Sequence, residues 1–161
     1  MKRLTGLVAA GVVLAWAGTV SAASGSQIFA SNCMVCHQPD AKGVPGIYPP
    51  LADTVGTYVK LKAGRIYLAH VPSFGLTGKV DSHGESFNNN MPPLSNLSDD
   101  DIAAVINYVL TKFNQSRLPA GFKPLTAEEV HGYRAKSMSE DEVHSERAAL
   151  LEALKKAGDL K

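Results

Sequence analysis

The sequence predicts an all-α fold, and three helix starts are the main evidence for it. Ser98, Thr126 and Ser139 can each cap a helix, and acidic side chains follow each of them within three positions. The long stretches between the predicted helices are rich in glycine and proline, which interrupt regular structure. At 161 residues and 45% apolar composition, the chain can form one domain with a hydrophobic core and an appendage.

The N-terminal segment has the three-part layout of a secretory signal peptide. Lys2 and Arg3 precede an apolar stretch over residues 7–16, and the small residues Val20-Ser21-Ala22 form a cleavage site. A retained membrane anchor is the alternative, but the apolar run is shorter than the ~20 residues that cross a bilayer. We therefore expect residues 1–22 to be cleaved, and the remaining chain to be exported to a bacterial periplasm without a membrane span. Cleavage changes the formal charge from +1 to −1.

Charge and cysteine content exclude two classes of function. The 16 basic residues are balanced by 15 acidic ones, so the chain lacks the excess of positive charge that nucleic-acid binding requires. The two cysteines cannot supply a disulfide framework. The function must therefore lie in a local site.

The first half of the mature chain contains two predicted helices and much irregular structure. Residues 24–36 have the spacing of a short helix, and the glycines and prolines of residues 38–51 prevent regular structure. Residues 58–70 form a second predicted helix, with a break near Gly64. Residues 72–90 are predicted to form a loop or a small hairpin.

The clearest helix is predicted over residues 98–113. Ser98 caps it, three aspartates favour the positive end of its dipole, and an apolar stripe predicts its buried face: Ile102, Val105, Ile106 and Val109.

Beyond residue 114 the chain becomes more highly charged. Residues 117–124 resemble a linker, and a direct repeat with a spacing of 13 residues follows. Val130, His131, Arg134 and Ala135 recur as Val143, His144, Arg147 and Ala148, and the last helix should stop at Gly158. This tail, residues 115–161, is either a docking element for a partner or two amphipathic helices packed on their own domain. Metal binding by the two repeated histidines is disfavoured, because they do not make a ligand set.

Cys33-Met34-Val35-Cys36-His37 is the strongest motif in the chain. On one helical turn, residues three apart share a face, so both thiols can bond to the vinyl groups of one porphyrin. His37 then lies under the iron as its proximal ligand. A redox-active thiol pair would require a βαβ pattern, and a zinc site would require a second ligand pair; the sequence contains neither. The sequence therefore predicts one covalent c-type haem.

Met91 is the predicted distal ligand of the iron. It lies in a polar loop before Pro92 and Pro93, which is a poor place for a methionine that merely fills a core. The competing candidates for the distal ligand are His70 and His83. His70 lies on a predicted helix face, where a histidine is more often a hydrogen-bonded core residue than a ligand, and His83 lies in a loop predicted to be solvated.

These features resemble the class I cytochromes c over residues 25–113. Gly25 and Phe29 match the N-terminal helix of that family, and Val105 and Tyr108 match the C-terminal helix that packs across it. The resemblance implies a class I cytochrome c fold, with crossed N- and C-terminal helices around a covalent haem. It assigns residues 23–114 to the haem domain and makes the tail a C-terminal helical extension.

The same resemblance implies the roles of further residues. Pro49 stands where the family's proline carbonyl orients the proximal histidine, and Met91-Pro92 matches the distal methionine motif. The chain departs from many relatives because its one tryptophan, Trp16, lies in the predicted signal peptide. Tyrosines are the candidates to bind a haem propionate in its place: Tyr48, Tyr58 and Tyr67.

Residues 75–93 look more narrowly like monohaem cytochromes that accept electrons from periplasmic dehydrogenases, among them the cytochromes of quinoprotein alcohol and sugar dehydrogenases. The implied function is an electron carrier, not an enzyme, between such a dehydrogenase and an acceptor such as a terminal oxidase or another cytochrome. One alternative is a fixed subunit of a dehydrogenase complex, docked through the tail. Another is a haem enzyme or sensor with a labile sixth ligand.

Overall fold

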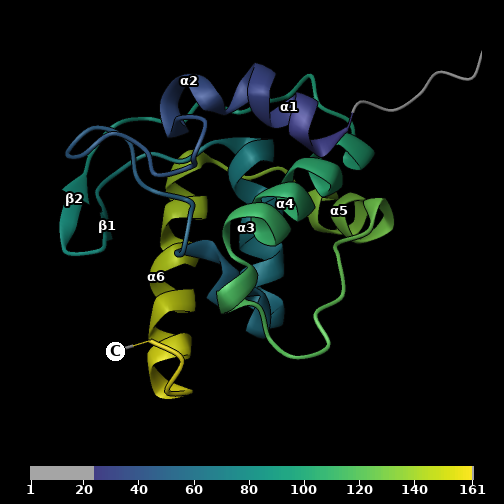
Figure 1. Cartoon of the computed structure of the whole chain (residues 1–161). Helices are drawn as coiled ribbons and strands as arrows, with labels where there is room; N and C mark the ends of the chain where they lie inside the picture. The colour runs from purple at the N-terminus through teal and green to yellow at the C-terminus, as the bar shows by residue number, and fades with distance from the viewer. Residues whose placement is uncertain (1–23, 161) are drawn as a thin grey trace, which may run out of the picture.

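The computed structural model describes residues 24–160, and helices make up more than half of them (Figure 1). The predicted signal peptide, residues 1–22, and its cleavage site lie outside the described residues. The elements in chain order are α1 (Gly25–Asn32), α2 (Met34–His37), the 3₁₀ helix η1 (Val55–Lys60), α3 (Lys62–Phe74), β1 (Val80–Ser82), β2 (Glu85–Phe87), α4 (Asp99–Phe113), the 3₁₀ helix η2 (Gln115–Arg117), α5 (Ala127–Arg134) and α6 (Glu140–Lys156). The all-α prediction is confirmed, with one small antiparallel hairpin.

The crossing of α1 over α4 forms the centre of the fold. The helices approach so closely that a Cβ on Gly25 would lie 2.2 Å from the carbonyl oxygen of Ala104. One turn later, the ring of Phe29 packs against the rings of Tyr108 and Phe113, at centroid distances of 5.6 and 5.3 Å. Ser98 caps α4 as predicted, and a capping box with Asp101 completes the helix start. The crossed helices expected from the sequence are therefore confirmed.

The helix predicted over residues 58–70 has different boundaries in the structure. Residues 55–60 form η1, the break lies at Leu61 rather than near Gly64, and α3 continues to Phe74. Gly64 lies in the first turn of α3 because the helix packs there on the backbone of Tyr58, where a Cβ would lie 1.9 Å from the carbonyl oxygen. Pro72 lies in the last turn, where the missing N–H removes one hydrogen bond but does not end the helix earlier.

The segment between α3 and α4 contains the predicted small hairpin. Val80 pairs with Phe87 at its open end, and both side chains are buried. Beyond the hairpin, Met91 and Leu76 form an isolated antiparallel bridge, with N···O distances of 2.9 and 2.8 Å. Met91 is therefore held in extended backbone at the C-terminal end of α3.

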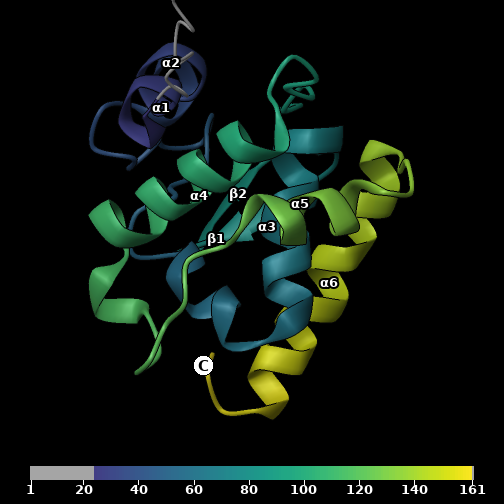
Figure 2. The same ribbon diagram turned by 90° about the vertical axis from the view of Figure 1, so that its right-hand side faces the viewer.

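The tail packs on its own domain, as one of the two sequence interpretations expected. Helix α5 lies against α3 and α4, and α6 runs along α3, as Figures 1 and 2 show. The apolar side chains of the tail are buried in the same core as those of α1 and α4; they are Leu125, Val130, Val143, Leu150 and Leu154. Helix α6 ends at Lys156 with Ala157 as its C-cap, and Gly158 follows at positive φ, where the sequence predicts the stop.

Candidate functional site

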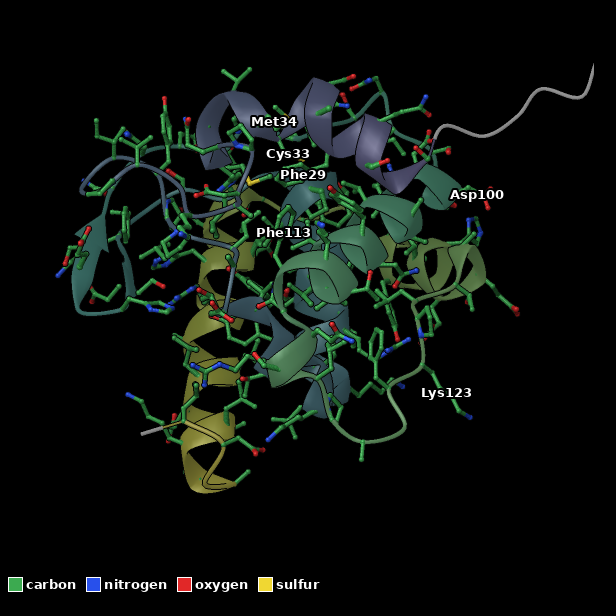
Figure 3. The ribbon with its side chains drawn as sticks, in the orientation of Figure 1. Phe29, Cys33, Met34, Asp100, Phe113 and Lys123 are labelled. Atoms are coloured by element: carbon green, nitrogen blue, oxygen red, sulfur yellow. The ribbon has the colours of Figure 1, made fainter. Side chains whose placement is uncertain are left out.

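Cys33 and Cys36 lie on one turn at the junction of α1 and α2. The backbone N–H groups of Cys36 and His37 both bond to the Cys33 carbonyl, at 3.2 and 2.8 Å, so the two cysteines share a face. Both are free thiols and half-buried, and Figure 3 shows Cys33 on the side of the turn that faces Phe29.

The electrostatic environment of Cys33 disfavours the redox-thiol interpretation. Burial raises the pKa of the Cys33 thiol to about 11, and the neighbouring Cys36 adds to this shift. A reactive redox cysteine has a lowered pKa, because the thiolate is the nucleophile. The Cys33 thiol therefore stays protonated at neutral pH.

His37 is the buried polar group of the site, with an exposed fraction of 8%. Its Nδ1 donates to the carbonyl oxygen of Pro49 at 2.9 Å, so Nε2 carries the lone pair. Burial lowers the pKa of His37, and the Pro49 hydrogen bond opposes that shift only in part. The imidazole is neutral at neutral pH, which is the state that binds a metal.

Met91, His70 and His83 lie in different environments. The backbone of Met91 is fixed by its bridge to Leu76, and its side chain is half-buried. Both ring nitrogens of His70 are engaged, by the Tyr133 carbonyl and the Glu146 carboxylate at 2.8 Å each, as expected of a satisfied core histidine. His83 is exposed and bonds through Nε2 to the hydroxyl of Thr54 at 2.9 Å.

The donor set fits a covalent haem. It offers two free thiols three residues apart and, directly after them, a neutral imidazole with one nitrogen held by a carbonyl. Among residues 24–160, no group of three metal-binding side chains is arranged around a common point. Zinc therefore finds no ligand set in the part of the chain that is described.

Asn114 is a structural residue of this region that the sequence did not reveal. Its side chain is fully buried, accepts the backbone N–H groups of Thr54 and Gly56 at 3.0 Å, and donates to the Leu51 carbonyl at 3.0 Å. It thus anchors the chain just beyond Pro49 to the end of α4. Its position directly after a predicted helix gave no sign of contacts some 60 residues away.

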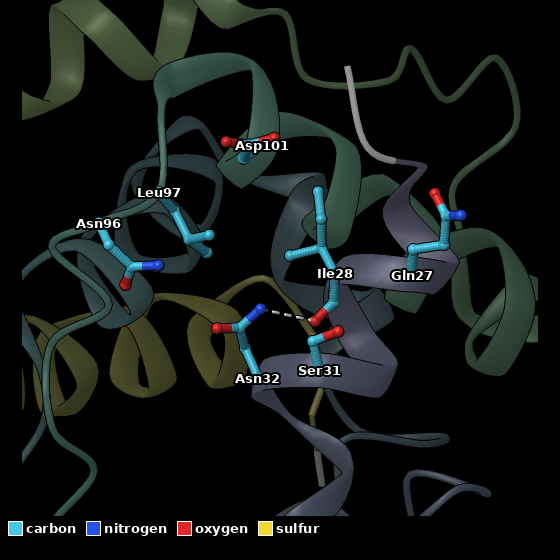
Figure 4. A pocket seen from close by; sticks show the side chains of 7 residues that line it. All are labelled: Gln27, Ile28, Ser31, Asn32, Asn96, Leu97 and Asp101. Atoms are coloured by element: carbon cyan, nitrogen blue, oxygen red, sulfur yellow. Dashed lines mark hydrogen bonds between the residues drawn. The ribbon is translucent and has the colours of Figure 1, made fainter. Parts of the chain in front are cut away.

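Two cavities lie near the crossed helices and the hairpin. The larger, of about 250 Å³, lies between α1 and the N-terminus of α4; its lining, shown in Figure 4, is Gln27, Ile28, Ser31, Asn32, Asn96, Leu97 and Asp101. It contains none of the predicted site residues. The smaller, of about 80 Å³, lies between the loop after His37 and the hairpin, and its lining includes Pro50 and Ser82.

Comparison with known proteins covers both the haem domain and the tail. The family described as Cytochrome c matches residues 22–112. The chain is 40% identical over 128 residues to cytochrome c-552 of Thermus thermophilus, which covers 80% of this chain and 97% of that protein. The family match ends at residue 112, but the alignment with this relative covers 128 residues. The similarity therefore extends beyond residue 112 and into the tail.

Two more distant relatives match the haem domain. The chain is 33% identical over 88 residues to the cytochrome c subunit of a quinone alcohol dehydrogenase from Gluconobacter oxydans (strain 621H), covering 53% of this chain and 17% of that protein. It is 35% identical over 88 residues to cytochrome c6 of Cyanidium caldarium, covering 55% of this chain and 68% of that protein. The crossed helices and these matches place the chain in the cytochrome c family, as a class I monohaem cytochrome that carries one covalent c-type haem and transfers electrons.

Proposed function

We propose that Cys33 and Cys36 would hold the haem through thioether bonds and that His37 and Met91 would bind its iron as proximal and distal ligands. The observation that carries this proposal is the His37 ring, which is buried directly after the two thiols with Nδ1 on the Pro49 carbonyl at 2.9 Å. That hydrogen bond fixes the tautomer and the orientation of the ring, and it increases the basicity of Nε2. The haem supplies a one-electron centre that cycles between ferrous and ferric iron.

Met91 completes the proposed ligand set from the segment after α3. The bridge to Leu76 fixes its backbone on one side, and Pro92 and Pro93 restrict it on the other. With His37 and Met91 as its ligands, the iron would keep no position open for oxygen or a substrate. The chemistry is then outer-sphere electron transfer, and methionine ligation raises the reduction potential.

We further propose that the protein is exported and carries electrons from a periplasmic dehydrogenase to a downstream acceptor, such as a terminal oxidase or another cytochrome. The signal-like segment over residues 1–22 supports export, and in residues 24–160 no helix is long and apolar enough to cross a membrane. The similarity to a dehydrogenase cytochrome subunit supports the choice of donor.

A fixed subunit docked through the tail is the second candidate. The apolar side chains of α5 and α6 are already used inside their own chain, since Val130, Val143 and Leu154 are completely buried. A docking surface on the tail would therefore consist of its charged outer face. This arrangement favours the free carrier over the fixed subunit.

The ligand set is tested by spectra of the exported protein. A pyridine haemochrome spectrum should show thioether-bound haem, and Cys33→Ala together with Cys36→Ala should abolish it. The ferric protein should show the far-red charge-transfer band of methionine ligation, and Met91→Ala should remove that band. A high-spin five-coordinate spectrum of the wild-type protein would instead indicate a haem enzyme or sensor.

The electron donor is tested by kinetics and by association. Substrate-reduced quinoprotein dehydrogenase should reduce the ferric protein in a second-order reaction that becomes slower as salt is added, as for a transient complex. Stable co-purification with a dehydrogenase would favour the fixed subunit. Lack of reduction by any such dehydrogenase would contradict the proposed donor.

A further inference from the structure

Arg147 is a buried cation that forms no close ion pair within the described residues. It is 9% exposed, and it is the one lysine or arginine that is buried among residues 24–160. Its guanidinium donates to the backbone carbonyl of Asp81 at 2.9 Å, but no carboxylate of the described residues lies within 4 Å of it. A buried charge without a counter-ion is costly, so an anion is expected at this position.

Two buried phenols flank the guanidinium. Tyr58 and Tyr67 are 4% and 5% exposed, and their rings lie edge to face with centroids 6.1 Å apart. Burial raises the pKa of both tyrosines, and the nearby Arg147 opposes the shift in each case. The phenols stay protonated and can donate hydrogen bonds to an anion, but they cannot neutralise the arginine.

An unpartnered polar group lies next to the residue that Arg147 contacts. Ser82 follows Asp81 in β1, and its hydroxyl oxygen is the one buried side-chain polar atom without a hydrogen bond among the described residues. Ser82 lines the small cavity that also contacts Pro50, the neighbour of the carbonyl that holds His37. The Ser82 hydroxyl therefore lies on the side of the hairpin that faces the loop after His37.

The face of α6 that carries Arg147 also reaches the segment of Met91. A Cβ on Gly75 would meet both Glu140 Oε1, at 2.9 Å, and the Met91 carbonyl oxygen, at 2.8 Å. Arg147 is seven residues after Glu140, on the same face and about 10 Å further along the helix. This face thus extends from the proposed distal ligand to the buried tyrosines.

We propose that Arg147, from the tail, binds a propionate of the haem, with the Tyr58 and Tyr67 hydroxyls as further donors. The proposal rests on the haem site described above, because the haem brings the carboxylates to the interior. An arginine suits this role since its planar fork can donate two parallel hydrogen bonds to one carboxylate. The tail then forms part of the haem pocket and stabilises the ferrous state through its positive charge.

The test compares Arg147→Gln and Arg147→Lys with Arg134→Gln, all in the haem-loaded, full-length protein. Arg134 is the equivalent arginine of the first repeat unit and already pairs with Asp99 at 2.6 Å, so it is the matched control. Arg147→Gln should shift the propionate bending mode in the resonance Raman spectrum. It should also shift the ferrous-to-ferric equilibrium about tenfold toward ferric, a fall in potential of about 59 mV. Arg147→Lys should restore most of the potential, and Arg134→Gln should leave both quantities at their wild-type values.

The outcomes separate this proposal from the haem site itself. A wild-type propionate mode and potential in Arg147→Gln, with the haem and its axial ligands intact, would overturn the role of Arg147 alone. If Arg147→Gln does not retain haem, Arg147→Lys decides the question by the same Raman mode, which must differ from that of the wild type. A wild-type protein without thioether haem would overturn the haem site and this inference together.

Discussion

Val130 and Val143 stand at the same position of the repeat, one in α5 and one in α6, and both are completely buried. Each repeat unit also begins with the same capping box, formed by Thr126 with Glu129 and by Ser139 with Glu142. The repeated sequence thus gives the same helix start and the same buried position in both copies.

The two arginines of the repeat have different surroundings. Arg134 reaches the Asp99 carboxylate at 2.6 Å and fastens α5 to the start of α4. Arg147 donates to the backbone carbonyl of Asp81 and lies beside the buried Tyr58 and Tyr67. The first unit is therefore held by ion pairs at the surface, whereas the second brings a positive charge into the interior.

His70 lies between the units and contacts equivalent positions of both. One ring nitrogen meets the carbonyl of Tyr133 and the other meets the carboxylate of Glu146, and these two residues are 13 positions apart. The comparison teaches that a repeat fixes local structure, while the neighbouring chain decides what each copy does.

Removal of both repeat units should lower the free energy of unfolding more than any other change. A chain that ends at Leu118 retains Asn114 but loses four fully buried side chains of the tail: Val130, Val143, Leu150 and Leu154. A single buried leucine-to-alanine change costs about 2–5 kcal/mol, against a total stability of about 5–15 kcal/mol. We expect no cooperative unfolding transition by circular dichroism. A transition at the wild-type midpoint would show that the tail does not stabilise the domain.

Val130→Ala and Val143→Ala test whether the two buried positions are equivalent. Each change removes two methyl groups from a fully buried site and should cost about 2–3 kcal/mol. Guanidinium denaturation should give two similar losses. A loss confined to one variant would show that the units contribute unequally to the core.

Substitution of His70 should reduce the stability of both repeat units, because its ring contacts one residue in each. His70→Leu keeps the contact with Phe74, whose ring lies 5.4 Å away, but leaves the Tyr133 carbonyl and the Glu146 carboxylate without their partner. We expect a loss of about 1–2 kcal/mol in urea denaturation. In hydrogen exchange, α5 and α6 should both become less protected; a change in one helix alone would contradict the bridging role.

Acidification should reduce the stability of the first repeat unit, and this effect should be the smallest of those predicted here. Hydrogen bonding to Arg65 lowers the pKa of Glu129. Burial acts to raise the pKa of Asp99, but hydrogen bonds from His131 and Arg134 outweigh burial, so the pKa of Asp99 is lowered as well. A carboxyl whose pKa is lower in the folded state stabilises the fold above its unfolded pKa of about 4. That contribution disappears as the pH falls through the folded value.

Because these pairs are partly exposed, their contribution is less than about 1 kcal/mol. Asp99→Asn should be less stable than wild type at neutral pH, and the difference should vanish below about pH 3. A difference that stays constant with pH would show that the charge of Asp99 does not matter.

Short-range features could be predicted from the sequence. The thiol spacing of Cys33 and Cys36 and the caps at Ser98, Thr126 and Ser139 depend on residues within one or two helical turns, so they are visible in the chain itself. The sequence predicts the break near Gly64, a residue type that weakens helices, but the break lies at Leu61. The actual role of Gly64 is to allow close packing on Tyr58, which becomes visible only when the two segments are in contact.

The sequence by itself determined the cofactor, the helix starts and the family, because each depends on residue types at short, fixed spacings. The tertiary structure decided that the tail packs inside its own chain and that His70 is engaged by two partners. It also decided that Arg147, rather than Arg134, lies beside buried tyrosines. These outcomes depend on contacts between residues more than 60 positions apart, such as His70 with Glu146 and Arg147 with Asp81. Such contacts form only where packing brings distant segments together, and a local pattern does not specify them.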